Sequence, residues 1–193
     1  VNGDAYREAI SSMLEETERL TLLIDNLLTL TRGGSGKIQL NPQPTDLTSL
    51  VQEVMNALSI LAEDKNQALS MDGPSTLMVT IDSATIRQAV MNILHNAIRY
   101  TPSGGRIQVL METESDGHAI IDIIDDGPGI PEAERTKVFG RFYRVDEARS
   151  REEGGAGLGL AIAQWAVEAN KGRIEFCDKE GPGSCCRITL PMN

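Results

Sequence analysis

Two carboxamides and a guanidinium, Asn92, Asn96 and Arg99, combine residue types that could bind a metal ion and an anion. Their spacing of four and three residues places all three side chains on one stripe of a helix. Amide oxygens are hard, neutral ligands for Mg²⁺, and an arginine binds phosphate oxygens with its planar fork. The stripe therefore indicates a site for Mg²⁺ and phosphate. A solvated polar helix face is the alternative explanation.

A carboxylate and two glycines, Asp125, Gly127 and Gly129, follow a nearly continuous apolar run at 119–124. A buried carboxylate at the end of a strand can accept a hydrogen bond from an exocyclic amine. The glycines let a flat ring approach the backbone closely. This turn predicts a contact with such a ring, and an ordinary acidic turn is the alternative.

A glycine-rich run at 154–160 precedes a predicted helix. Glycines in that place expose backbone N–H groups and the positive end of the helix dipole to a phosphate. The run is not a dinucleotide-binding turn, because no strand precedes it and Leu160 stands where that motif has its third glycine. It is not a Walker loop either, since no Gly-Lys-Ser/Thr sequence follows it.

The segment 139–144 joins aromatic and basic residues in a chain with only 4% aromatic residues. Phe139 and Phe142 are suited to anchor a loop, and Arg144 is suited to reach a phosphate. The polar stretch at 145–153 is typical of a mobile lid. We therefore expect a lid over about 130–156 with the two phenylalanines at its base.

Helices and strands alternate through residues 37–193 and must position these groups. The helix with the amide stripe is predicted to begin after Asp82, a good N-cap, and to end near Tyr100. Two other helices are predicted over about 46–64 and 158–170. Strands are predicted at 37–40, 67–71, 77–81, 106–112, 118–125, 173–177 and 185–190. This order predicts a two-layer α/β sandwich in which helices back a mixed sheet.

Residues 4–32 are predicted to form one long helix. From Tyr6 to Thr31, seam residues recur by alternating fours and threes, which is typical of a coiled coil or antiparallel bundle. At about 1.5 Å per residue the helix is too long for a small domain to cover, so a partner helix is expected. A helix folded back onto the rest of the chain is the alternative. The glycine-rich segment 33–36 then predicts a flexible joint.

Charge and cysteine content restrict the classes of function. The 193 residues include 28 acidic and 18 basic side chains, for a formal net charge of −10. Such a chain repels phosphate backbones and anionic lipid, so no nucleic-acid partner is expected. Three cysteines fit a reducing compartment, and no apolar run reaches the ~18 residues of a membrane span. We therefore expect a cytoplasmic location.

Four sequence boxes follow one another in a recognisable order. They are Asn92…Asn96-Ala-Ile-Arg-Tyr, Asp125-x-Gly-x-Gly, Phe139-x-x-Phe and Gly155-x-Gly-Leu-Gly-Leu. In this order they resemble the N, G1, F and G2 boxes of sensor histidine kinases, and 181–184 is similar to the final glycine box of that family. The resemblance covers about residues 4–193. It implies a Bergerat ATP-binding fold over 37–193, with Mg²⁺ and ATP held under the lid.

The resemblance assigns roles at the phosphate end of the nucleotide. Asn96 would bind the Mg²⁺ ion that bridges the ATP phosphates, and Asn92 would support the phosphates or the metal. Arg99 stands where the family usually has lysine, which keeps the charge but changes reach and hydration. These three are the implied catalytic residues. The glycine box would hold the phosphates with Gly155, Gly157, Leu158, Gly159 and Leu160.

At the base end, the resemblance implies that Tyr100 flanks the adenine ring. Asp125 would accept a hydrogen bond from the adenine amino group. The other positions implied to contact the nucleotide are Gly127, Gly129, Ile130, Tyr143, Arg144 and Ser184.

Residues 1–32 resemble the second helix of the dimerisation and phosphotransfer hairpin of the same family. Neither His95 nor His118 has the sequence context of a phosphoacceptor, so the acceptor histidine is expected on another segment. The resemblance implies a homodimer formed through that hairpin and a response-regulator receiver domain as partner. It implies membrane attachment only through parts of the parent protein outside this sequence.

Other functions remain open beside the protein histidine kinase that these boxes predict. A Bergerat-type ATPase of the chaperone or topoisomerase class resembles this fold but uses a glutamate where Asn92 stands. An amide cannot remove a proton from water, so steady hydrolysis is expected to be slow. A non-catalytic nucleotide-binding module would bind ATP without transferring phosphate. A further alternative is an anti-sigma-type serine kinase, but that function would not explain the long heptad helix.

Overall fold

The computed structural model describes residues 6, 13, 39–145 and 157–192. The chain divides into two compact units, Val1–Ile38 and Gln39–Asn193. In the first unit the described residues are Tyr6 and Met13, which are both helical. The predicted N-terminal helix and the joint after it otherwise lie outside the described residues.

The second unit contains the following elements. The strands are β1 (Gln43–Asp46), β2 (Ala68–Asp72), β3 (Met78–Ile81), β4 (Arg106–Thr113), β5 (His118–Asp125), β6 (Arg173–Cys177) and β7 (Ser184–Pro191). The helices are α2 (Leu47–Asp64), α3 (Ser83–Tyr100) and α5 (Gly159–Ala169), with short 3₁₀ turns η1 (Glu132–Glu134) and η2 (Lys137–Phe139). The three predicted helices of this unit are confirmed. Among the described residues, no helix combines the length and apolar character needed to cross a bilayer.

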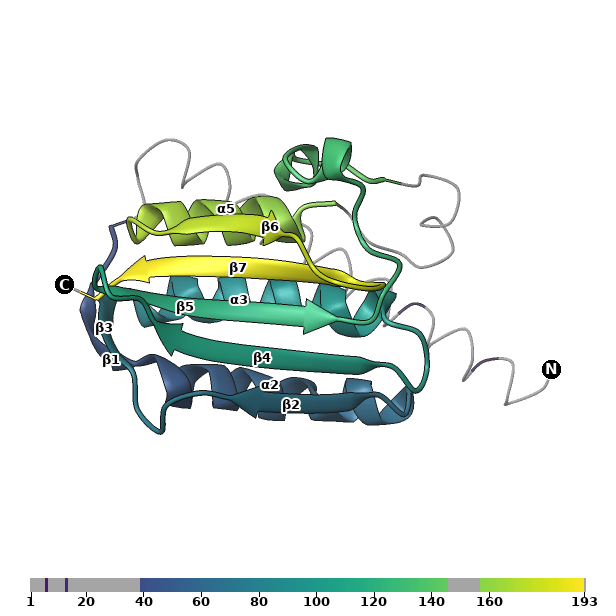
Figure 1. Cartoon of the computed structure of the whole chain (residues 1–193), viewed down its shortest axis with the longest axis horizontal. Helices are drawn as coiled ribbons and strands as arrows, with labels where there is room; N and C mark the ends of the chain where they lie inside the picture. The colour runs from purple at the N-terminus through teal and green to yellow at the C-terminus, as the bar shows by residue number, and fades with distance from the viewer. Residues whose placement is uncertain (1–5, 7–12, 14–38, 146–156, 193) are drawn as a thin grey trace. The chain divides into compact units, whose positions relative to one another are not determined.

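The main sheet has five strands in the order β2-β4-β5-β7-β6. The β2–β4 pair is parallel and the other pairs are antiparallel, so the sheet is mixed. Figure 1 shows α2, α3 and α5 against one face of this sheet, with α3 between the other two. The predicted two-layer α/β sandwich is therefore confirmed.

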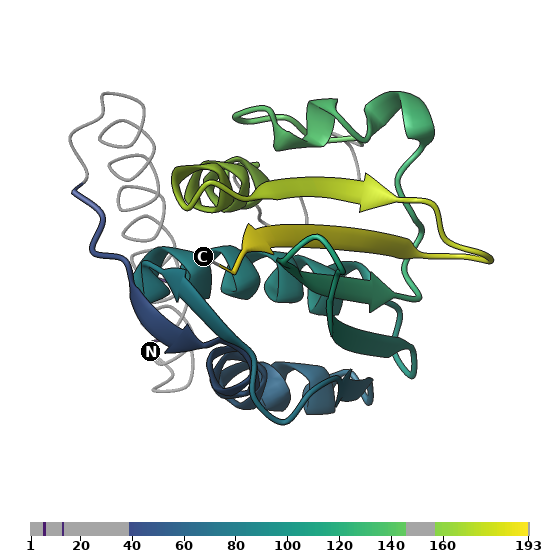
Figure 2. The same ribbon diagram turned by 60° about the vertical axis from the view of Figure 1, so that its left-hand side comes forward.

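The first strand differs from the prediction. Residues 39 and 40 are not in a strand, and β1 instead occupies Gln43–Asp46, which includes Pro44. Proline lacks an N–H donor, which argues against a strand interior but is tolerated in a strand with only one neighbour. β1 pairs antiparallel with β3 in a separate two-stranded sheet (Figure 2). The strands on either side of the turn at 72–74 thus belong to different sheets.

The core between the helices and the sheet is aliphatic, as the low aromatic content requires. The buried face of α3 consists of Ile86, Ala89, Val90, Ile93, Leu94, Ala97 and Ile98. On the sheet, the strands contribute Ile107, Val109, Ile121, Ile123, Ile188 and Leu190. Removing this apolar area from water is the main favourable term in folding. The other stripe of α3, which carries Asn92 and Asn96, is only half-buried.

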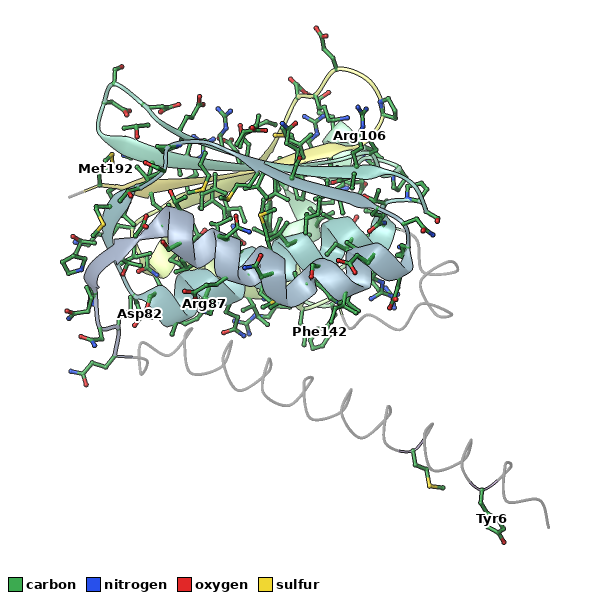
Figure 3. All side chains as sticks on the ribbon, turned by 90° about the horizontal axis from the view of Figure 1, so that it is seen from below. Tyr6, Asp82, Arg87, Arg106, Phe142 and Met192 are labelled. Carbon is green, nitrogen blue, oxygen red and sulfur yellow. The ribbon has the colours of Figure 1, made fainter. Side chains whose placement is uncertain are left out.

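The N-terminal end of α3 is fixed by hydrogen bonds from separate segments. The Asp82 carboxylate caps the helix by accepting from the Thr85 N–H at 3.0 Å, and it also accepts from the Asn41 N–H at 2.9 Å. Asn170, at the end of α5, accepts from the Asp82 N–H at 2.7 Å and donates to the Thr85 hydroxyl at 2.8 Å. In Figure 3, Asp82 and Phe142 lie apart along the helix layer.

Candidate functional site

The last two turns of α3 present the predicted polar stripe. Asn92, Asn96 and Arg99 are half-buried, and the Tyr100 ring at the end of the helix is 44% exposed. The Arg99 guanidinium carbon lies 5.4 Å from the centre of the Tyr100 ring, within range of a cation–π interaction. This end of the helix therefore presents amide, cationic and aromatic groups together.

Asp125, the last residue of β5, is only 8% exposed and is oriented by two hydrogen bonds. One carboxylate oxygen accepts from the Gly127 N–H at 2.8 Å, and the other accepts from the Ser184 hydroxyl. Ser184 begins β7 and pairs with Asp125 across the antiparallel ladder. The structure thus brings these three predicted site residues together.

Glycines around Asp125 allow close approaches of the backbone. A Cβ atom at Gly183 would lie 1.8 Å from the carbonyl oxygen of Asp125, so only glycine fits there. A Cβ at Gly127 would lie 3.4 Å from the carbonyl oxygen of Tyr100. The end of α3 and the turn after β5 are therefore neighbours, as a shared base-binding site requires. Gly129 lies against the Gly183 carbonyl, and Ile130 packs against the core.

The N-terminal end of α5 faces the amide stripe of α3. A Cβ at Gly159 would lie 3.6 Å from the side-chain oxygen of Asn92. The residue at the N-cap, Leu158, makes no capping hydrogen bond with its side chain, so the first N–H groups of α5 lack that usual acceptor. The Asn92 side-chain nitrogen is also buried without a hydrogen-bond partner. The buried Asn92 nitrogen and the start of α5 thus lie together, and both offer donor groups that suit an anion.

The described lid residues are tied to the start of the glycine box. Gly157 has a positive φ of 67°, and the Phe142 N–H donates to its carbonyl oxygen at 2.8 Å. Phe139 is buried and packs against Phe176, with ring centres 5.5 Å apart, so it anchors the loop as expected. Phe142 is instead 61% exposed (Figure 3). The loop is thus anchored by one of its two phenylalanines.

Tyr143 and Arg144 lie beside this junction. The Tyr143 hydroxyl donates to the Glu134 carboxylate, so the tyrosine links the lid segment to η1. Arg144 is half-buried at the end of the described part of the lid. Gly155 and the lid residues 146–156 lie outside the described residues.

An ionic cluster lies beside Asp125 that the sequence did not predict. Asp126 contacts Arg106 at 3.0 Å and Lys179 at 3.8 Å. The hydrogen bond from Arg106 is the main cause that lowers the pKa of Asp126. The cluster fixes the turn after β5 to the start of β4 and to the β6–β7 loop. Sequence patterns held no signal for it, because its members are far apart in the chain.

A family model described as histidine kinase-, DNA gyrase B- and HSP90-like ATPase matches residues 81–193, which include α3, Asp125 and α5. The chain belongs to this family. The matched region carries the predicted N, G1, F and G2 boxes and all the elements that form the candidate site.

Sensor histidine kinases are among the relatives of this ATPase-family chain. Sensor histidine kinase WalK of Bacillus subtilis is 36% identical over 191 residues, which cover 98% of this chain and 31% of WalK. The chain thus spans about a third of that relative. The solved structure of histidine kinase AdeS of Acinetobacter baumannii has a TM-score of 0.79 at 28% identity, covering 95% of this chain and 84% of that one. Full-length ShkA in complex with AMPPNP has a TM-score of 0.82 at 25% identity, covering 96% of this chain and 38% of ShkA.

Both histidines of the sequence lie within the region that the ATPase-family model matches. His95 lies on α3, where partial burial of its ring, followed by the charge of Arg99, lowers its pKa. His118 begins β5 after a turn, and its ring nitrogen lies 2.8 Å from the Asp116 carboxylate. These are the helix flank and the turn in which the sequence places them.

Proposed function

We propose that this chain binds Mg-ATP between the end of α3, the turn after β5 and the start of α5. We further propose that it donates the γ-phosphoryl group to a histidine of a sensor-kinase dimerisation domain. The observation that carries the proposal is that α3 adjoins both other parts of the site, with Asn92 beside Gly159 of α5 and Tyr100 beside Gly127 in the turn that orients Asp125. Membership of the ATPase family and the similarity to sensor histidine kinases support it.

The adenine end is assigned to Asp125 and its neighbours. Each carboxylate oxygen accepts one hydrogen bond within the protein and keeps capacity for another. The adenine amino group supplies a donor of the right kind. Tyr100, beside this turn, provides an exposed aromatic face, and Gly127 and Gly129 leave room for the flat base.

The phosphate end is assigned to Asn92, Asn96, Arg99 and the first residues of α5. The unpartnered amide nitrogen of Asn92 and the first N–H groups of α5, which have no side-chain cap from Leu158, are suited to phosphate oxygens. The amide oxygen of Asn96 is a ligand type that Mg²⁺ accepts together with phosphates and water. Asn96 would hold the Mg²⁺ ion, which would offset the negative charge on the phosphates during transfer.

Phosphoryl transfer breaks the bond between the γ-phosphorus and the β–γ bridging oxygen and forms a phosphorus–nitrogen bond to the acceptor imidazole, with ADP as leaving group. The chain's own residues contribute position and charge and do not act as a nucleophile. The acceptor histidine would come from the dimerisation hairpin, through which the protein would also form a homodimer. A receiver-domain aspartate of a response regulator would then take the phosphoryl group.

The amide at position 92 favours transfer over steady ATP hydrolysis. A hydrolase needs a general base to activate water, and Asn92 cannot take up a proton. Rapid ATP hydrolysis that Asn92→Ala abolishes would favour the ATPase alternative.

Calorimetry with ATP, with and without Mg²⁺, tests binding first. The second step offers γ-labelled ATP and a dimerisation hairpin that contains the acceptor histidine. We expect Mg²⁺-dependent binding and label on the hairpin. Binding without transfer would identify a non-catalytic nucleotide-binding module, and absence of binding would contradict the whole proposal.

A further inference from the structure

A lysine from the turn between α2 and β2 binds the carboxyl end of α3. The Lys65 ammonium donates to the carbonyl oxygens of Ile98 at 2.8 Å, Arg99 at 2.6 Å and Thr101 at 3.1 Å. The last carbonyls of a helix have no partner within the helix. Lys65 therefore supplies three missing hydrogen bonds and places a positive charge at the negative end of the helix dipole.

Gln67, two residues further along, binds the same helix end. Its side-chain nitrogen donates to the carbonyl oxygens of Ile98 at 2.9 Å and Thr101 at 2.7 Å. The side chain is only 7% exposed, so water cannot readily replace these bonds. A buried amide held by two acceptors has one orientation, and it fixes those acceptors in turn.

The loop after α3 binds back to the same turn. The Ser103 hydroxyl and the Gly104 N–H both donate to the Lys65 carbonyl oxygen, at 2.8 Å and 3.1 Å. The Ala68 N–H donates to the Gly105 carbonyl oxygen at 3.0 Å. Hydrogen bonds thus run in both directions between the α2–β2 turn and the end of α3. The last turn of α3 cannot move without breaking several of them.

The held turn carries two residues of the candidate site. Arg99 and Tyr100 lie within it, and the Tyr100 carbonyl adjoins Gly127 in the turn that orients Asp125. We propose that Lys65 and Gln67 are positioning residues for the nucleotide site. They hold the last turn of α3 so that Arg99 and Tyr100 keep their places relative to Asp125. This inference rests on the proposed nucleotide-binding function.

The test compares the Mg-ATP dissociation constant of the whole chain with those of Lys65→Met and Gln67→Met. Calorimetry is done at a temperature where circular dichroism shows every variant folded. We expect Lys65→Met to raise the dissociation constant about tenfold, as for loss of charge-assisted hydrogen bonds, and Gln67→Met to raise it less. Lys65→Arg keeps a charged donor and should restore most of the affinity.

Lys171→Met is the matched control, because Lys171 is an exposed lysine beyond the far end of α5 from Gly159. It should leave the dissociation constant unchanged. Amide hydrogen exchange measures the opening of the last turn of α3 separately from the stability of the whole fold. In Lys65→Met, exchange should accelerate over 98–101 and stay unchanged over the helix interior at 89–94.

Wild-type affinity in a folded Lys65→Met variant would overturn the inference and leave Lys65 as a stabilising residue only. If Lys65→Met does not fold, wild-type affinity in a folded Gln67→Met variant would overturn the inference in the same way. Should the wild-type chain not bind Mg-ATP, the proposed function fails instead. Unchanged exchange at 98–101 would then refute the positioning role independently.

Discussion

At the scale of single residues, Asp125 is the group whose surroundings are most specific. Its two oxygens are held by Gly127 and Ser184, from the turn after β5 and from β7. An incoming amine therefore meets a carboxylate whose orientation is already set. Binding then carries no entropy cost for ordering that side chain.

Replacing Asp125 with asparagine should weaken ATP binding by about 1.5–3 kcal/mol, the range for a hydrogen bond to a charged group. The amide presents one acceptor oxygen in place of two and adds a donor that adenine's amino group cannot use. Calorimetry measures the change. Ser184→Ala, which keeps the carboxylate and its bond to Gly127, should cost less. Unchanged affinity in Asp125→Asn would remove this residue from the site.

Replacing Asn96 with alanine should abolish phosphoryl transfer and remove most of the Mg²⁺-dependent gain in nucleotide affinity. The amide oxygen is lost, and alanine offers no metal ligand in its place. Asn56→Ala on α2 is a matched control, because it removes an exposed helical asparagine away from the site. The assignment of the metal fails if Asn96→Ala transfers phosphate as the control does.

The site residues differ in how far sequence could predict them. The spacing of Asn92 and Asn96 places them on one stripe, and the structure has that stripe. The partners Lys65, Gln67 and Arg106 could not be predicted, because lysine and glutamine here bind backbone carbonyls that carry no residue-specific pattern. The anchoring of Tyr143 by Glu134 likewise depends on how a loop folds in space.

At the scale of elements, the helices follow from local signals. Asp46 and Asp82 cap α2 and α3 as N-cap aspartates are expected to, and apolar periodicity gives the buried faces. The strands are less local. The sequence predicts the first strand at 37–40 and not at Gln43–Asp46, because β1 pairs with β3 from a distant part of the chain. Nothing in 37–46 reveals which residues pair.

The cap of α2 predicts a pH dependence. The hydrogen bond from the Ser49 hydroxyl, followed by that from the Leu77 N–H, lowers the pKa of Asp46 below its usual 3.8. A carboxylate whose pKa is lower in the folded than in the unfolded protein stabilises the fold at pH values above its unfolded pKa. This stabilisation is lost as the pH falls through the folded pKa. The difference in urea midpoint between wild type and Asp46→Asn should be constant above pH 3.8 and shrink below it. A difference that is constant down to the acid limit would contradict this.

At the scale of the whole molecule, the residues that stabilise the fold and those of the candidate site lie on different sides of α3. One stripe of α3 is buried against the sheet, and the other faces α5 and the loops. The two-layer class could be predicted from the alternation of helices and strands. The strand order could not, because the parallel β2–β4 pair joins strands separated by the whole of α3. Such long-range pairing is decided by packing of the complete sheet.

Leu94→Ala tests this separation of roles. Leu94 is fully buried on the core side of α3, so the truncation should lower the free energy of unfolding by about 2–5 kcal/mol. Denaturant titration measures the loss. The folded variant should still bind Mg-ATP as wild type does, and a large loss of affinity at full folding would show that the core side also shapes the site.

The most direct test of Mg-ATP binding at this site is a crystal structure of the chain with Mg²⁺ and a saturating non-hydrolysable ATP analogue. We expect the adenine amino group to bind Asp125, and the phosphates to lie between Asn92 and Asn96 and the start of α5. An analogue bound elsewhere, or absent from this site at saturation, would contradict it.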